Sequence, residues 1–336
     1  MQFSFRKRFR VIMALVIIMV ITASWGFLVH KTVHQLAVYE LPESISPFFY
    51  QNMEYLVNNA PRPDVRRNQD STEATKHFID LEMFGKDAVT KMPEDWVSAV
   101  KLYSKDSLLK YGYVPYHIVY MKEKLTEAFK TGNKDTILFY ATDMGHYIED
   151  ANVPLHVTSN YDGQLTNQKG LHSLWESVIP EKELSGYTLY SSHKATYLKN
   201  PSHAIWEAIR RSASLLPEVF AKEIEVSAGF TEAQKYTVQT RRGKEYKNYS
   251  PEFAKAYAIA LKTSINEQLI HSANLVADFW YTSWVDAGKP DLSGITPNWN
   301  KESADKLKAE MGYFSTNKLV ENNLLLSKKP STPGAE

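Results

Sequence analysis

The chain has 336 residues, of which 43% are hydrophobic, so it can bury a substantial core and wholesale disorder is excluded as the default state. It has no cysteine, which excludes disulfides, thiolate zinc sites and cysteine nucleophiles. Any metal must therefore be held by His, Asp, Glu or backbone groups.

The first 24 residues have the pattern of an export signal. Arg6, Lys7, Arg8 and Arg10 precede an apolar run over 11–21, which is shorter than the roughly 20 residues of a membrane span. We predict a signal peptide over 1–24 and an exported protein, periplasmic or secreted, with no stable membrane span after cleavage. An uncleaved anchor is the alternative.

Removing this segment changes the balance of charge. It takes four positive charges from a formal net charge of +1 and leaves −3. A broad basic surface for duplex nucleic acid is therefore not expected, and a polyanion would have to be attracted locally, for example by bound metal.

Helical periodicity dominates the chain, and no run of alternating residues predicts a strand. Apolar residues recur at spacings of three and four from Val114 to Phe129, and Gly132 is placed to end that helix. A second helix is predicted from about Lys134 and another over 201–221. The fold class is therefore all-α.

The clearest helix start lies further on, where Ser250 can cap and Pro251 suits the first helical position. The apolar stripe over 253–280 predicts one long core helix that stops near Gly288. Residues 225–249 are predicted to be a polar surface excursion.

The strongest chemical signal is the run over 145–156, GHYIEDANVPLH. His146 and Asp150 are four residues apart on a predicted helix, so they share a face and can reach one metal or two adjacent metals. His156 follows at the point where Pro154 should end the helix. This pattern is typical of a metal site.

A second pair, His172 and Glu176, repeats the four-residue spacing. Either pair alone could be a surface charge pair, but two pairs with a further histidine favour a metal site. Upstream, Asp64 lies just after two prolines and precedes His77. An aspartate beside prolines is more often a turn residue or cap, so its spacing alone leaves its role open.

The predicted mature N-terminus begins with Trp25 and reaches His30 five residues later. With the motifs above, this start resembles the superfamily of bacterial zinc-dependent phospholipases C and fungal single-strand-specific nucleases. Members begin, after signal cleavage, with a Trp whose amino group and carbonyl bind zinc, followed shortly by a His ligand. The resemblance covers 25–176 in scattered motifs and weakens towards Asp286.

The resemblance implies a single multi-helix domain built around a trinuclear zinc cluster. This phosphoesterase domain would span 25–325, with a family-variable region over 181–249 and a disordered tail over 326–336. The variable region either packs against the metal core or forms a wall of the substrate cleft.

The resemblance also implies the ligands of three zinc ions. The first zinc would be held by Asp64, His77, His146 and Asp150. The second would be held by Trp25, His30 and the shared Asp150, and the third by His156, His172 and Glu176.

These ions would outweigh the carboxylates and give a cationic pocket suited to phosphate. By the same resemblance, water between the two zincs joined by Asp150 attacks phosphorus in line. Asp64 orients or deprotonates that water, and the third zinc stabilises the leaving oxygen. No organic cofactor is implied.

Some positions depart from the pattern or compete for a role in it. Glu149 stands where members usually have glycine, and His34 lies one turn after His30. The remaining histidines have no place in the pattern and are predicted to be ordinary core or surface residues: His117, His193, His203 and His271.

The substrate is predicted from three positions near the first ligands. In the nucleases, the residue matching Arg67 meets phosphate, Phe78 would stack on a base and Asp80 would bond its edge. Phe78 and Asp80 could instead be core filler and a partner for the ligand His77. Glu176 in place of aspartate, and the lack of cysteine, are closer to the phospholipases.

The leading prediction is thus a zinc-dependent nuclease or nucleotidase acting on single-stranded nucleic acid. The alternative is a phospholipase C that cleaves phospholipid head groups. A third possibility is a non-catalytic envelope protein with structural zinc, although a site of only His156, His172 and Glu176 would be open, as in enzymes. No protein partner is implied.

Overall fold

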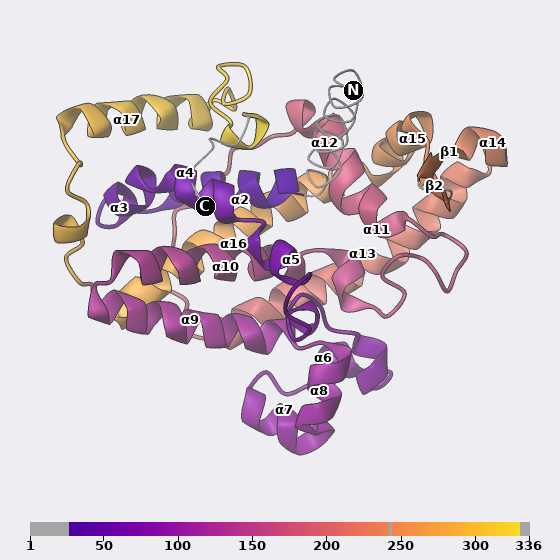
Figure 1. Ribbon diagram of the computed structural model, residues 1–336, viewed down its shortest axis with the longest axis horizontal. Helices are drawn as coiled ribbons and strands as arrows, with labels where there is room; N and C mark the ends of the chain where they lie inside the picture. Colours follow the sequence, from indigo (N-terminus) through magenta and orange to yellow (C-terminus); the bar gives the residue numbers. More distant parts are fainter. Residues whose placement is uncertain (1–26, 242–243, 330–336) are drawn as a thin grey trace, which may run out of the picture.

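The computed structural model describes residues 27–241 and 244–329, and Figure 1 shows that helices joined by loops make up most of this part. The predicted all-α class is confirmed, with one β-hairpin as an exception. No helix in these ranges is long and apolar enough to cross a membrane. The predicted signal peptide and Trp25 lie outside the described residues.

The centre of the fold is helix α2 (Phe27–Glu40), which packs against α10 (Lys134–Ala151) and α16 (Ser264–Asp286). Helix α2 is buried from Thr32 to Glu40 without an exposed face. A helix in this position needs no polar stripe, because neighbouring helices cover it on all sides. It therefore forms a fixed base for side chains that point towards α10.

The predicted helix over 114–129 is α9 (Val114–Thr131), which packs along both α10 and α16. Gly132 ends it in the left-handed conformation at φ 64°, as the sequence predicts. Helix α10 follows with Asn133 as its N-cap, where the side chain accepts from the Thr136 N–H. Both helices are confirmed.

Short helices fill the segment between α2 and α9. The loop between α5 and η2 borders the metal-ligand face of α10, whereas α6, α7 and α8 form a lobe that projects from the main body (Figure 1). In chain order these elements are α3 (Ser46–Gln51), α4 (Met53–Asn59), α5 (Arg62–Arg66), η1 (Ala74–Lys76), η2 (Leu81–Phe84), α6 (Ala88–Lys91), α7 (Trp96–Tyr103) and α8 (Lys105–Tyr111).

A second run of short elements follows α10. These are η3 (Pro154–Val157), α11 (Leu171–Ser173), η4 (Leu174–Val178), α12 (Ile179–Glu183) and η5 (Leu184–Gly186). The turn η4 is a π-helix, a rare conformation that is frequently found at functional sites.

The helix predicted over 201–221 is α13 (Pro201–Ser227), and it continues for six residues beyond the predicted end. It packs against η3 and α10, and the Ser212 hydroxyl donates to the Ala151 carbonyl at 2.8 Å. This part of the 181–249 region therefore packs against the core that carries the predicted ligands.

The expectation that the chain has no strands is wrong at one place. After α14 (Glu232–Lys235), strands β1 (Tyr236–Arg241) and β2 (Lys244–Tyr249) pair antiparallel in a hairpin. Its polar residues hide the alternation that identifies a half-buried strand, because most of the hairpin's described side chains face solvent. Tyr249 is the exception and packs on Phe253.

The single long helix predicted over 253–280 is also wrong. Ser250 caps α15 (Pro251–Leu261) as predicted, but Lys262 adopts φ 53° and the chain restarts in α16 at Ser264. The apolar stripe serves two cores: Phe253 to Ile265 belong to one cluster, and Leu269 to Trp280 belong to the other. The break lets each half face its own cluster.

The C-terminal part lies on the side of α2 opposite α10, where η7 contacts α2 (Figure 1). It contains η6 (Ser293–Ile295), α17 (Lys301–Ser315) and η7 (Leu326–Lys328). The tail predicted to begin at Leu326 starts with η7, where the Leu326 N–H donates to the Gln35 side chain. Residues 330–336 lie outside the described part.

Candidate metal centre

Four segments bring the predicted ligands to one place: α2, the chain from α5 to η1, α10, and the run from η3 to η4. Backbone hydrogen bonds join two of them, since the Ile79 N–H donates to the His156 carbonyl at 2.9 Å. The site therefore depends on tertiary packing of segments that are far apart in sequence.

Helix α10 presents His146 and Asp150 on one face. His146 is fully buried, and its Nδ1 lies 3.0 Å from the Ala60 carbonyl, so Nε2 is left facing the centre. Asp150 Oδ2 lies 3.4 Å from this Nε2. The predicted shared face is present.

His77 and Asp64 complete this group from the other side. His77 Nδ1 lies 2.8 Å from Asp150 Oδ2 and 3.1 Å from His146 Nε2. Asp64 Oδ1 lies 3.8 Å from His77 Nδ1 and 3.9 Å from His146 Nε2. Four donors from two segments thus lie close together, and His146 belongs to a donor set with each of the other three.

His30 enters from α2 beside this group. Its ring stacks on His146 with centroids 3.9 Å apart, and its Nε2 lies 3.8 Å from both Asp64 Oδ2 and Glu176 Oε1. His34, the competing histidine, faces away: its two ring nitrogens contact the backbone carbonyls of His30 and Thr142. The structure therefore places His30, not His34, at the centre.

Gly145 makes this arrangement possible. A Cβ at this position would lie 2.5 Å from the His34 Nε2, which is closer than real contacts allow. A side chain here would push α2 away from α10, so the glycine permits the close approach of the two helices.

The third group is formed by His156, His172 and Glu176. Glu176 Oε2 lies 2.7 Å from His172 Nε2 and 3.3 Å from His156 Nε2, and the two nitrogens are 2.9 Å apart. The π-helical turn η4 carries Glu176, while Gly170 at φ 98° turns the chain into α11. His156 Nδ1 contacts the His77 carbonyl at 2.7 Å, which leaves Nε2 for the centre.

Together, these side chains form four overlapping sets of donors close enough to hold a metal. The sets are His30, Asp64 and His146; His77, His146 and Asp150; His156, His172 and Glu176; and His30, Asp150 and Glu176. Every predicted ligand in the described residues belongs to at least one set. Asp150 belongs to two of them, as a bridging carboxylate would.

The spacing of the donors is compatible with a bound metal. The ring nitrogens of two histidine pairs face each other at 2.9 and 3.1 Å. Tetrahedral zinc with bonds of about 2.0–2.1 Å places its nitrogen ligands roughly 3.3 Å apart. A small relaxation would therefore seat an ion between each pair.

The electrostatics of the cluster also favour a cation. The ion-pair partners found for Asp150 and Glu176 in the described residues are all histidines. Although burial opposes it, Asp150 and Glu176 raise the pKa of His156 to about 9. Protons on histidine thus balance the carboxylates here, and a metal ion can take their place.

The sequence did not identify Glu73, a buried carboxylate that contacts the ring of His77 on the side away from Asp150. Glu73 is fully buried and its Oε1 is 3.6 Å from His77 Nε2, while its carboxylate also binds Arg66, Lys76 and Tyr147. Glu73 precedes His77 by four residues, and this spacing was the available signal. Carboxylates in this position fix the orientation of a metal-binding histidine.

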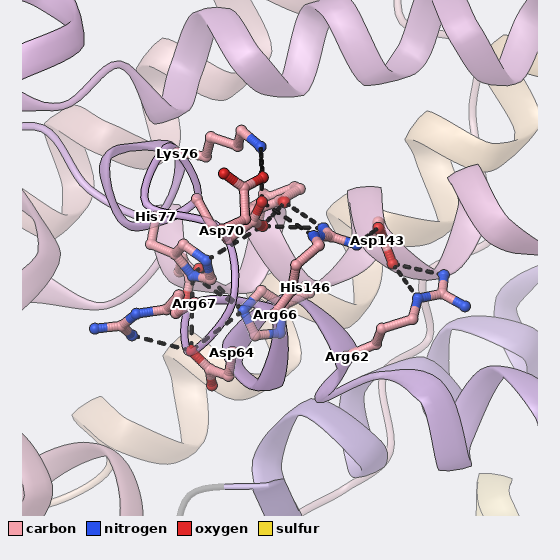
Figure 2. A network of polar contacts seen from close by, with 12 residues as sticks. Arg62, Asp64, Arg66, Arg67, Asp70, Lys76, His77, Asp143 and His146 are labelled. Carbon is pink, nitrogen blue, oxygen red and sulfur yellow. Dashed lines mark hydrogen bonds and ion pairs between the residues drawn. The ribbon is translucent and has the colours of Figure 1, made fainter. Parts of the chain in front are cut away.

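Arg66 connects Glu73 to a network of ion pairs around Asp143, which Figure 2 shows. The guanidinium groups of Arg62 and Arg66 both contact Asp143, at 2.6 and 2.9 Å respectively. Arg67 lies on the other side and contacts Asp64 at 3.0 Å. Arg67 is 45% exposed, so it can meet a ligand that approaches the centre from solvent.

Phe78 and Asp80 lie on the segment that follows His77. The Phe78 ring and carbonyl face Gly112, where a Cβ would come within 2.6 Å of both. Asp80 is half-buried, and burial, with Glu82 nearby, raises its pKa to about 6. The alternative in which Asp80 supports His77 is not what the structure contains, because Glu73 and Asp150 contact that ring.

The other histidines lie elsewhere. His117 packs edge-on against Tyr147, His193 contacts Asp278, His203 contacts Glu94 and His271 contacts Asn152. None of them belongs to a donor set in the described residues.

Comparison with known proteins found no family model that matches this chain and no match among curated proteins. The case for function therefore depends on the geometry of the site.

Proposed function

We propose that the protein is a zinc-dependent hydrolase of phosphate esters, related to the zinc phospholipases C and single-strand-specific nucleases. The supporting observation is the set of overlapping His and carboxylate groups, with Asp150 common to two of them. The first metal would be held by Asp64, His77, His146 and Asp150, the second by His30 and Asp150, and the third by His156, His172 and Glu176. Trp25 would complete the second set.

Zinc is the metal best suited to these donors. Imidazole nitrogen with carboxylate oxygen is a common zinc ligand combination, whereas calcium and magnesium prefer oxygen alone. Bound zinc supplies Lewis acidity and lowers the pKa of water.

Residues near the donor sets suggest how the phosphate ester would be bound and how a water molecule would be positioned beside it. Asp64 is 25% exposed, and its two oxygens face different ligands, Oδ2 towards His30 and Oδ1 towards His77. Its carboxylate can therefore accept a hydrogen bond from a water molecule that lies between the two donor sets. Arg67 reaches the same carboxylate and can bind a phosphate oxygen. His172 is 28% exposed, so the third set is also open towards solvent. These openings support an enzyme over a closed structural zinc site.

We place single-stranded nucleic acid or a nucleotide first among substrates. The guanidinium group of Arg67 lies beside the donor cluster, where it can bind the anionic phosphate of a diester. The half-buried Asp80 can form hydrogen bonds with the edge of a base, and the neighbouring Phe78 can stack on its face. The phospholipase alternative is supported by a different feature. Tyr161 and Leu165 are 51% and 71% exposed, and the Tyr161 ring lies edge-on to His172.

The test is hydrolysis by the purified mature protein, with zinc content measured on the same sample. Single-stranded DNA, a 3′-nucleotide and phosphatidylcholine vesicles would be compared side by side, with chelated protein as control. We expect about three zinc ions per chain and cleavage of the nucleic-acid substrates, as for trinuclear phosphoesterases. Cleavage of lipid alone would favour the alternative, and a folded protein that takes up no zinc would refute the proposal.

A further inference from the structure

Glu149 lies inside the metal-binding run of α10, between His146 and Asp150, yet it belongs to none of the donor sets in the described residues. Its side chain is only 3% exposed. A buried carboxylate needs a partner, because removing its charge from water is costly. The partner of this residue therefore indicates its role.

The partner is the ring of His30. Glu149 Oε2 lies 2.5 Å from His30 Nδ1, across the interface between α10 and α2. This contact is an ion pair, and among the described residues neither oxygen of Glu149 and neither ring nitrogen of His30 has a hydrogen-bond partner. Glu149 thus differs from Glu73, which binds Arg66 and Lys76 in addition to its histidine.

The contact fixes which nitrogen of His30 faces the metal centre. With the carboxylate beside Nδ1, the ring proton is favoured on Nδ1, and the lone pair of Nε2 is then left facing Asp64 and Glu176 at 3.8 Å. The stacking on His146 at 18° restricts rotation of the same ring. His30 is therefore held by one ring contact and one carboxylate.

We propose that Glu149 is a positioning residue that orients His30 and sets its tautomer for metal binding. It does not bind the ion itself, since it contacts the ring nitrogen that points away from the centre. This inference rests on the proposed metal centre. Carboxylates behind zinc-binding histidines typically change metal affinity by about 10- to 100-fold when removed.

The experiment is a zinc titration of the metal-depleted full chain against a chromophoric chelator, for wild type, Glu149→Met and Glu149→Gln. Methionine fills similar volume without an acceptor, whereas glutamine keeps an oxygen that can accept from Nδ1–H. We expect Glu149→Met to weaken one zinc equivalent by about 10- to 100-fold and Glu149→Gln to restore part of the loss. Unchanged affinity of every equivalent in Glu149→Met would overturn the inference.

Two further variants separate positioning from packing. Glu310→Met removes a buried carboxylate that accepts from Tyr39 and contacts no predicted ligand, and it should leave zinc binding unchanged. In a His30→Ala background, Glu149→Met should weaken zinc no further, because the two residues act through one ring. An additional loss in the double variant would assign Glu149 to packing instead.

The readout also separates this inference from the proposed function. Zinc binding that depends on Glu149, in a protein that cleaves none of the esters, would refute the function and leave the positioning role intact. A wild-type chain that binds no zinc would overturn both.

Discussion

Helix α10 carries two buried polar regions that differ in how their charge is balanced. Nearer its N-terminal end, Asp143 is met by the guanidinium groups of Arg62 and Arg66, and the network is complete without any ligand (Figure 2). Two turns further along the same face, Asp150 is met by histidines, and its contacts become complete only with protons or a metal.

The difference shows how a site can be told from a structural network. Both regions use residues four apart on the same helix: Asp143 with Tyr147, and His146 with Asp150. Arginine stays charged at any physiological pH, so the first network is permanent. Histidine can be neutral and offer a lone pair, so the second can exchange its protons for a cation.

Among the proposed variants, Asp150→Asn should have the largest effect on zinc content and on the rate of hydrolysis. This change keeps the shape of the side chain but removes one of the two carboxylates that each belong to two donor sets, the other being Glu176. We expect loss of at least one zinc equivalent and a fall in hydrolysis of about 100-fold or more, beyond that of second-shell changes. Metal analysis and initial rates on one sample test this, and full zinc content in the variant would contradict it.

The next largest effect is expected on the stability of the metal-depleted protein, which should depend on pH. Glu149 raises the pKa of His30 to about 10, and Asp150 and Glu176 raise the pKa of His156 to about 9, although burial opposes both shifts. Both values exceed the unfolded pKa of about 6.5. The stability that His156 contributes is therefore complete below pH 6.5 and is lost as the pH rises through about 9. Burial raises the pKa of Glu149 to about 7, so the contribution of its pair with His30 is largest above pH 7 and is lost as the pH rises through about 10.

Denaturant unfolding of chelated protein at pH 6.5, 8 and 10 should thus show a fall of a few kcal/mol in the free energy of unfolding. Zinc competes with the same protons, so the zinc-loaded protein should keep its stability over this range. Equal pH profiles with and without zinc would contradict this prediction.

The smallest effect is expected from Asp143→Asn, the matched change two turns earlier on the same face of α10. Loss of the carboxylate leaves Arg62 and Arg66 partly unpaired, and because both are about a quarter exposed we expect the free energy of unfolding to fall by only about 1 to 3 kcal/mol. Zinc content should fall much less than in Asp150→Asn, because Asp143 reaches the ligand His77 only through Arg66 and Glu73. A loss of zinc as large as in Asp150→Asn would contradict this prediction.

The sequence by itself determined the helical class, the helices that begin at Val114 and Lys134, and the shared face of His146 and Asp150, because these depend on local spacing. The other predicted ligands came from the resemblance to a family. His146 and Asp150 share a face wherever the helix lies, and Gly132 ends its helix through its own backbone freedom. The same local logic missed the break at Lys262, since an apolar stripe does not reveal that two different cores share it.

Only the tertiary structure decided which residues support the ligands. Glu73 and Glu149 are charged side chains that sequence patterns assign to a solvated surface, yet both are buried against histidines from other segments. The five-residue step from Trp25 already favoured His30 over His34, and the structure adds that His34 packs against α10 at Gly145. Such contacts join residues far apart in the chain, so spacing carries no record of them, whereas the packing of the helices fixes each one.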